Sequence, residues 1–256
     1  MNDLHTSPPT PVIQIKGLGK SFGLTRALHD LTLHVNPGEI VGLVGDNGAG
    51  KSTFIKILSG FERPDEGQLF FDGKPVQLKS AAEARSMGIE TVYQEQALAD
   101  DLSVMNNLFL GSELTRRVGP FVFLDKKRME SEAQDMLDLL RLRVSPSQEA
   151  RFCSGGEKQG IAIARAIHVK ARLVILDEPT NALGVVAVDR VLDLIRELKR
   201  KGIACIFISH NIQHVMDVSD RVTMFVHGTK ILDVPVSETS TMQLVEMLNN
   251  RSGSRA

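Results

Sequence analysis

The chain has 256 residues, of which 42% are apolar and 24% are charged, and its 30 Lys and Arg residues against 31 Asp and Glu residues leave a formal net charge of −1. This composition suits a globular protein that buries a full core in one large domain, or in a domain with a small subdomain. The balanced charge disfavours a chain that wraps nucleic acid, although it is compatible with a local basic patch, and no apolar stretch reaches the roughly 20 residues of a membrane helix. We therefore expect a cytoplasmic chain with no nucleic-acid partner.

The first elements that the sequence predicts are an unstructured leader and an antiparallel sheet. Residues 1–11 include the proline-rich segment Ser7-Pro8-Pro9-Thr10-Pro11, which favours disorder. Short apolar runs then occur at Ile13–Ile15, Leu31–Val35 and Leu69–Phe71, and turn signals occur at Pro37-Gly38 and Asp72-Gly73. Together they predict an antiparallel β subdomain near the N-terminus.

Four further apolar runs are short and nearly continuous, which is typical of parallel strands covered on both faces. They are Glu39–Val44, Leu173–Leu176, Ala204–Ser209 and Arg221–Val226. Between two of them, apolar residues from Val188 to Leu198 recur at helical spacing, and the pattern stops at Gly202, a residue type that commonly ends a helix. The order strand, helix, strand predicts an α/β fold with a parallel core sheet.

The middle of the chain has no such strands but carries helical patterns such as Met129–Leu142. We therefore expect an inserted α-helical subdomain at residues 98–148 within a single domain at residues 12–250. The core and its β subdomain would comprise residues 12–97 and 149–235, followed by a C-terminal helix at 236–250 and a disordered tail at 251–256. Cys153 and Cys205 lack CxxC or CxxH spacing, which favours buried thiols over a disulfide or a metal site.

The segment Gly45–Ser52, GDNGAGKS, lies between a predicted strand and a predicted helix. The pattern GxxxxGK[ST] in that position is a phosphate-binding loop, because its glycines let successive backbone N–H groups point at phosphate oxygens. Lys51 would reach the β- and γ-phosphates, Ser52 would bind Mg²⁺, and Thr53 would contact the α-phosphate. The predicted nucleotide-binding residues here are Gly45, Asp46, Asn47, Gly48, Ala49, Gly50, Lys51, Ser52 and Thr53. The alternative is a glycine-rich turn with an incidental lysine, which the flanking strand and helix disfavour.

The apolar run Leu173–Leu176 ends in the acidic pair Asp177 and Glu178. Ligands of open α/β sheets bind at the C-terminal ends of the strands, where these carboxylates would emerge. Side chains alternate along a strand, so we expect the two acids to point in opposite directions, with Asp177 holding Mg²⁺ and Glu178 orienting the attacking water. An ordinary exposed strand end is the alternative for the pair taken alone.

The segment Ser154-Gly155-Gly156-Glu157-Lys158-Gln159, followed by the run Ile161–Ile167, resembles the signature segment of ATP-binding-cassette (ABC) ATPases. Gln94 in TVYQEQ resembles the glutamine that joins the core to the helical subdomain in that family, although Gln96 could compete for this role. His210 in FISHN resembles the family's switch histidine, and Phe22 in KSFG resembles the aromatic residue that stacks on adenine. The resemblance covers residues 12–235.

This resemblance implies a fold, an activity and a set of site residues. The fold is a P-loop NTPase with a RecA-like parallel core, and the activity is ATP hydrolysis with ATP and Mg²⁺. The implied catalytic residues are Lys51, Gln94, Glu178 and His210. The implied metal ligands are Ser52, Gln94 and Asp177. The further residues implied to contact nucleotide are Phe22, Ser154, Gly155, Gly156 and Glu157.

The signature segment would present free N–H groups and a hydroxyl at a helix start, and so would form a second anion site. In the family, two cassettes pack head to tail, and this segment of one closes on the γ-phosphate held by the other. The resemblance therefore implies a homodimer with two composite sites; a simple helix cap is the alternative. Three residues depart from the family's pattern, and the first is Cys153, which stands in place of a leucine at the first signature position. Glu157 replaces a glutamine, and would accept from a ribose hydroxyl or interact with the helix dipole, whereas Gly184 replaces a common aspartate.

The segments GLVGDNGAGKSTFIKILSG, ETVYQEQALADDLSVMNNLFLG and EPTNALGV resemble the monosaccharide importers of the ribose and fructose type. This implies a peripheral ATPase subunit at the cytoplasmic face of the cell's inner membrane. Two copies would serve a pair of separate permease subunits, and an extracytoplasmic binding protein would deliver the sugar. The alternatives are another ABC transporter, a soluble cassette protein that acts on ribosomes or DNA, and a nucleotide-binding regulator without turnover. A regulator should lack the acid at Glu178.

Overall fold

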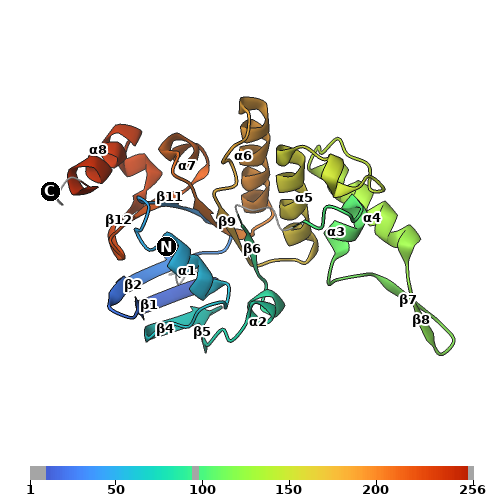
Figure 1. Ribbon diagram of the computed structural model, residues 1–256, viewed down its shortest axis with the longest axis horizontal. Helices are drawn as coiled ribbons and strands as arrows, with labels where there is room; N and C mark the ends of the chain where they lie inside the picture. Colours follow the sequence, from blue (N-terminus) through green and yellow to red (C-terminus); the bar gives the residue numbers. More distant parts are fainter. Residues whose placement is uncertain (1–9, 94–97, 253–256) are drawn as a thin grey trace, which may run out of the picture.

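The computed structural model describes residues 10–93 and 98–252. Figure 1 shows two β-sheets, a group of helices beside them, and a hairpin that projects from these helices. The larger sheet has six strands in the order β12-β11-β3-β10-β9-β6. Its central strands are β3 (Ile40–Val44), β9 (Leu173–Asp177), β10 (Ala204–Ile208) and β11 (Arg221–Val226). These four strands pair in parallel, so the α/β fold with a parallel core that the sequence predicts is confirmed.

Two edge strands of this sheet were not predicted. β6 (Ile89–Val92) pairs in parallel with β9, and β12 (Thr229–Pro235) pairs antiparallel with β11. β6 has only four residues, and two of them, Glu90 and Thr91, are polar. Such a short and partly polar run carries no clear strand pattern. It forms a strand because of the surface that it packs against, and the local sequence does not record that surface.

The smaller sheet is the expected antiparallel β subdomain, with the strand order β2-β1-β4-β5. Its strands are β1 (Ile13–Phe22), β2 (Thr25–Val35), β4 (Glu66–Phe71) and β5 (Lys74–Val76). Ile13 lies opposite Val35 and Ile15 lies opposite Leu33, and all four side chains are buried. Because side chains alternate along a strand, this register directs one apolar face of the sheet into the core.

The six-stranded sheet is covered on both faces, which explains its continuous apolar runs. Along β9, Val174 and Leu176 join the core beneath the helices α5 (Gly155–His168), α6 (Val185–Arg200) and α7 (Ile212–Val218). Leu173 and Ile175 point to the opposite face, into the core shared with the antiparallel sheet and α1 (Lys51–Leu58). A strand buried on both faces needs apolar residues at every position.

The inserted segment contains a hairpin as well as helices. The helices are α3 (Val104–Phe109) and α4 (Lys126–Leu139), and the antiparallel hairpin consists of β7 (Thr115–Val118) and β8 (Phe121–Leu124). α4 begins and ends three residues earlier than the apolar pattern Met129–Leu142 indicates, because Asp125 caps its start and the chain leaves the helix at Leu140. Every residue of the hairpin strands is exposed, so no burial pattern marked them as strands.

The remaining elements complete the periphery. They are α2 (Ala81–Ser86), α8 (Thr241–Ser252) and two short 3₁₀ helices, Ala150–Phe152 and Val236–Glu238. α8 lies beside α7 at one end of the molecule. Within the described ranges, no helix combines the length and the apolar character that crossing a membrane requires.

Candidate functional site

The loop between β3 and α1 has a backbone that only glycine tolerates at key positions. Gly48 and Gly50 have φ values of 80° and 98°, in the left-handed region. A Cβ atom at Gly50 would lie 2.7 Å from the carbonyl oxygen of Ala27, so a side chain there would collide with β2. A Cβ atom at Gly48 would meet nothing within 4 Å. The loop is therefore packed tightly on one side and open on the other.

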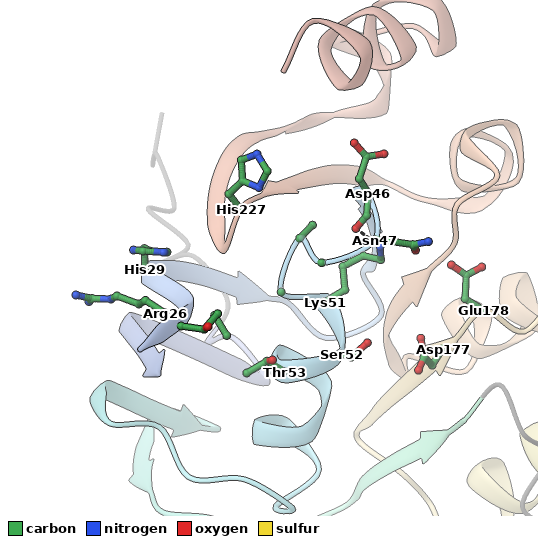
Figure 2. A pocket seen from close by; sticks show the side chains of 15 residues that line it. Arg26, His29, Asp46, Asn47, Lys51, Ser52, Thr53, Asp177, Glu178 and His227 are labelled. Atoms are coloured by element: carbon green, nitrogen blue, oxygen red, sulfur yellow. Dashed lines mark hydrogen bonds between the residues drawn. The ribbon is translucent and has the colours of Figure 1, made fainter. Parts of the chain in front are cut away.

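The loop borders a cavity of about 540 Å³. Its lining consists of Thr25, Arg26, Ala27, His29, Asp46, Asn47, Gly48, Ala49, Gly50, Lys51, Ser52, Thr53, Asp177, Glu178 and His227. Figure 2 shows the two acids on one side of Lys51 and Ser52, and Arg26 and His29 on the other. The structure thus brings the predicted phosphate loop and the predicted acidic pair to one cavity.

Lys51 is held against the loop itself. Its Nζ donates to the carbonyl oxygens of Gly45 at 2.5 Å and Asp46 at 3.1 Å. Burial lowers the pKa of Lys51, while the negative charges of Glu178, Asp46 and Asp177 act in the opposite direction. Among the described residues, the hydrogen-bond acceptors of this ammonium are neutral carbonyl oxygens. Lys51 is therefore well placed to exchange these contacts for an anion, since charge-assisted hydrogen bonds are stronger than neutral ones.

The alternation expected at the acidic pair does not extend to Glu178. β9 ends at Asp177, and Glu178 adopts a left-handed φ of 51° while its N–H donates to the carbonyl of Ile208 at 3.0 Å. This turn directs both acids into the same cavity instead of to opposite sides. Burial raises the pKa of Asp177, the charge of Glu178 raises it further, and Lys51 partly counteracts both. Two close carboxylates with one lysine form a site that favours an additional cation.

Glu178 also contacts the residue that follows the neighbouring strand. His210 Nδ1 lies 2.8 Å from Glu178 Oε2, and the backbone N–H of His210 donates to the same oxygen at 3.3 Å. A second cavity of about 490 Å³ lies on this side, lined in part by Gly45, Asn47, Glu178 and His210. Glu178 therefore borders both cavities, and His210 fixes the orientation of its carboxylate.

The predicted signature segment forms the start of α5, away from the first cavity. Ser154 caps the helix, and its Oγ accepts from the N–H of Glu157 at 3.4 Å. Glu157 Oε2 accepts in return from the N–H and the hydroxyl of Ser154, each at 2.8 Å. This capping box satisfies helix donors reciprocally, so Glu157 serves here as a cap residue at the positive end of the helix. Neither residue is part of the lining of the first cavity.

The predicted adenine-stacking residue, Phe22, also lies outside the lining of the first cavity. Phe22 is 45% exposed at the end of β1, with the Nζ atom of Lys20 at 5.3 Å from the centre of its ring. Gln94 lies outside the described residues.

Sequence reasoning missed the far wall of the cavity. Thr25, Arg26, Ala27 and His29 come from β2, and His227 comes from the turn between β11 and β12. These segments meet where the N–H of His29 donates to the carbonyl of Gly228 at 2.8 Å. Only the folded antiparallel sheet places them beside the loop, and no motif in the sequence marks them.

The cavity offers ligands that suit magnesium. Among the described residues, no group of three or more His, Cys, Asp or Glu side chains could hold a metal ion by itself. Ser52 and Asp177, however, both line the cavity and supply a hydroxyl and a carboxylate. Magnesium in nucleotide sites commonly takes one or two protein oxygens and completes its shell with water and substrate phosphates, so these residues fit it.

The loop, the acids at the strand ends and the parallel sheet define a nucleotide-binding protein of the phosphate-loop class. A sequence model of the family described as ABC transporter matches residues 28–181, more than half of the chain. The xylose/arabinose import ATP-binding protein of Sulfolobus acidocaldarius is 42% identical over 93% of this chain and 94% of its own length. The fructose import ATP-binding protein of Rhizobium meliloti is 44% identical over 86% of this chain and 87% of its own length.

Solved structures agree with these sequence matches. An ATP-binding cassette of an ABC transporter in its ADP conformation is 25% identical and superposes with a TM-score of 0.79, over 94% of this chain and 96% of that chain. The chain belongs to the ABC transporter family of ATP-binding proteins, whose activity is ATP hydrolysis.

Proposed function

We propose that this chain is the ATP-hydrolysing subunit of an importer for a monosaccharide. The observation that carries the proposal is the meeting of Lys51, Ser52, Asp177 and Glu178 around one cavity, in a chain similar along nearly its whole length to a xylose/arabinose import protein. A ribose import ATP-binding protein of Burkholderia pseudomallei is also 38% identical, but this chain covers only 48% of it.

In the proposed site, the backbone N–H groups of the loop and the ammonium of Lys51 hold the phosphates of ATP. Ser52 and Asp177 hold Mg²⁺, which neutralises phosphate charge when it is bound. The carboxylate of Glu178 accepts a proton from the attacking water or orients it, and His210 keeps this carboxylate in place through its 2.8 Å contact. Phe22 offers an exposed ring for stacking on the adenine, and Gln94 remains a proposed metal and water contact.

The start of α5 supplies the second half of a site in a partner copy. Ser154 and Gly155 are exposed at the start of α5, where the positive end of the helix dipole favours an anion. They lie outside the lining of the chain's own cavity, so a phosphate held by another copy is the ligand that we assign to them. ATP would then hold two copies together, because its γ-phosphate contacts both. Hydrolysis would release them.

Sedimentation of the Glu178→Gln variant tests this arrangement. With ATP and Mg²⁺ the variant should form a dimer, because it binds ATP without hydrolysing it and so keeps the γ-phosphate. With ADP, which has no γ-phosphate, the variant should stay monomeric. Adding Ser154→Arg should abolish the dimer and leave ATP binding to the monomer intact. Ser80→Arg is the matched control, because Ser80 is also an exposed N-cap serine, at the start of α2. A dimer that survives Ser154→Arg, or a Glu178→Gln variant that stays monomeric with ATP, would contradict the composite site.

The importer itself needs membrane partners. We propose a pair of separate permease subunits, which would place this chain peripherally at the cytoplasmic face of the inner membrane, and an extracytoplasmic protein that delivers the sugar to the permeases. Co-purification of the full chain with co-expressed permease subunits tests this, with ATPase activity as the second readout. ATPase activity stimulated by the permeases supports the importer. Stimulation by ribosomes or DNA in their place would establish the soluble alternative.

A further inference from the structure

The β7–β8 hairpin exposes more apolar surface than any packing role within the chain explains. Figure 1 shows it projecting beyond α3 and α4, away from both sheets. Its large apolar side chains are Val118, Phe121, Val122, Phe123 and Leu124, with exposed fractions of 52%, 65%, 59%, 51% and 50%. Exposed clusters of large apolar side chains on a protein surface mark sites of interaction.

Both faces of the hairpin are apolar at its tip. Val118 lies opposite Phe121 and Arg116 lies opposite Phe123, so these four side chains share one face, where the rings of Phe121 and Phe123 are 6.3 Å apart. On the other face, Arg117 lies opposite Val122 and Thr115 lies opposite Leu124. Each face therefore carries an arginine together with apolar side chains. A ribbon that packs on a single protein surface would leave one of these faces in water.

Basic side chains surround this apolar ribbon. Arg116 and Arg117 lie in β7, and Lys126 and Lys127 begin α4. In the described part of the chain, none of the four has a side-chain hydrogen bond or an ion pair. Asp125, which lies between the hairpin and α4, accepts from the N–H of Arg128 as a helix cap. Two arginines among the apolar side chains of the hairpin and two lysines at its base form a surface complementary to negative charge.

We propose that the β7–β8 hairpin inserts its tip into the headgroup region of an anionic lipid membrane. Lipid surrounds an inserted element on all sides, so it covers both apolar faces at once. The arginines have long apolar stems and can extend their guanidinium groups to the phosphates while the stems stay among the lipids. Cations near an anionic membrane surface each strengthen binding, and salt weakens the attraction. This contact is independent of any permease and of ATP hydrolysis.

Sedimentation of the full chain with lipid vesicles tests the proposal without a permease. Vesicles of phosphatidylcholine mixed with phosphatidylglycerol are compared with vesicles of phosphatidylcholine alone, at low and high salt. The chain should bind the anionic vesicles more strongly, and salt should weaken this binding. Arg116→Gln with Arg117→Gln should lower the partition coefficient roughly thirtyfold, from the contribution of each basic residue near such a surface. Phe121→Ser with Phe123→Ser should lower it at least tenfold, because two apolar rings no longer leave water.

Matched controls separate the hairpin from general surface effects. Arg141→Gln with Arg143→Gln removes two exposed arginines elsewhere, and Met242→Ser with Val245→Ser removes two exposed apolar side chains from α8. Both control variants should bind vesicles like the unmodified chain. Equal binding by the hairpin variants and the unmodified chain would overturn the proposal. So would self-association in the absence of lipid that the Phe121→Ser, Phe123→Ser variant abolishes, because a second copy would then be the occupant of the hairpin.

Discussion

Nδ1 of His210 lies 2.8 Å from Oε2 of Glu178, and the two residues follow the adjacent strands β10 and β9. Because an ionised carboxylate only accepts hydrogen bonds, Nδ1 of His210 is the donor in this contact when Glu178 is ionised. The contact holds the Glu178 carboxylate between the two cavities that it borders. The position of this acid therefore depends on β10 as well as on its own strand.

The first prediction concerns Glu178→Gln. This change removes the negative charge but keeps the size of the side chain, so it should lower the ATP turnover number by roughly a hundredfold to ten-thousandfold. Lys51, Ser52 and Asp177 remain, so the dissociation constant for ATP should change little. Phosphate release and a direct nucleotide titration measure the two effects separately. Turnover close to that of the unmodified chain would contradict the role of Glu178 in hydrolysis.

Lys51→Ala should instead weaken nucleotide binding. The variant loses the ammonium that can bind phosphate, and charge-assisted hydrogen bonds contribute about 1.5–3 kcal/mol, so the dissociation constant for ATP should rise roughly tenfold to a hundredfold. Lys56→Ala is the matched control, because Lys56 is an exposed lysine of the same helix outside the cavity lining. Titration calorimetry measures both variants. Equal ATP affinities for Lys51→Ala and Lys56→Ala would refute the phosphate contact.

The raised pKa of Asp177 predicts how stability depends on pH in the absence of metal. The folded chain binds the Asp177 proton more tightly than the unfolded chain, so ionisation of this group lowers the free energy of unfolding as the pH rises above its ordinary pKa of 3.8. Asp177→Asn removes that penalty. The variant should therefore melt at a higher temperature than the unmodified chain at neutral pH, and the difference should shrink as the pH falls toward 4.

Thermal unfolding in chelator across this pH range measures the effect. A melting difference between Asp177→Asn and the unmodified chain that does not change with pH would show that ionisation of Asp177 is not its cause. Adding Mg²⁺ and ATP should reverse the order, because only the unmodified chain keeps the carboxylate that suits the metal.

Arg221 should be important for stability although it lies outside the site. It donates to Glu39 at 2.8 Å, to Asp233 at 2.5 Å and to the carbonyl oxygen of His34 at 2.5 Å, and so it connects β11 to β12 and to the end of β2. The guanidinium and both carboxylates are largely buried. Arg221→Gln removes the salt-bridge partner of Glu39 and one of the two partners of Asp233, which keeps Lys230 at 2.8 Å. It should lower the free energy of unfolding by about 2–4 kcal/mol.

The exposed ion pair between Arg172 and Asp72 provides the control for this prediction. Its two side chains are 52% and 41% exposed. Arg172→Gln should therefore change the free energy of unfolding by less than about 1 kcal/mol, because solvent screens such a pair. Urea unfolding of the two variants compares them, and equal effects would contradict the importance assigned to burial of Arg221.

The core strands could be predicted from the sequence because burial leaves a local pattern. β3, β9, β10 and β11 are apolar at nearly every position, and each coincides with a predicted run to within one or two residues. The β7–β8 hairpin could not be predicted in this way. β8 is the apolar run Phe121–Leu124, but its partner β7 reads TRRV and is mostly polar. The two strands therefore share no alternating pattern that would identify them as a pair.

The candidate site shows the same contrast between features that a local pattern records and features that arise only when distant segments meet. The phosphate loop and the acids are local motifs, and the structure gathers Lys51, Ser52, Asp177 and Glu178 around one cavity. The β2 wall, with Arg26 and His29, depends on a contact between segments far apart in the chain, which no local pattern records. The direction of Glu178 also escaped prediction, because alternation along a strand holds only while the strand continues, and here it ends at Asp177.

The order of strands in the larger sheet sets the width of the reaction site. β10 separates the loop-bearing strand β3 from the acid-bearing strand β9. Two strand spacings correspond to about 10 Å, so a row of phosphates with a cation fits between the loop and the acids. The central strand carries His210 just beyond its end, in contact with Glu178. β10 thus sets the distance between the phosphate loop and the acids. A register shift in this strand would move His210 relative to both of them.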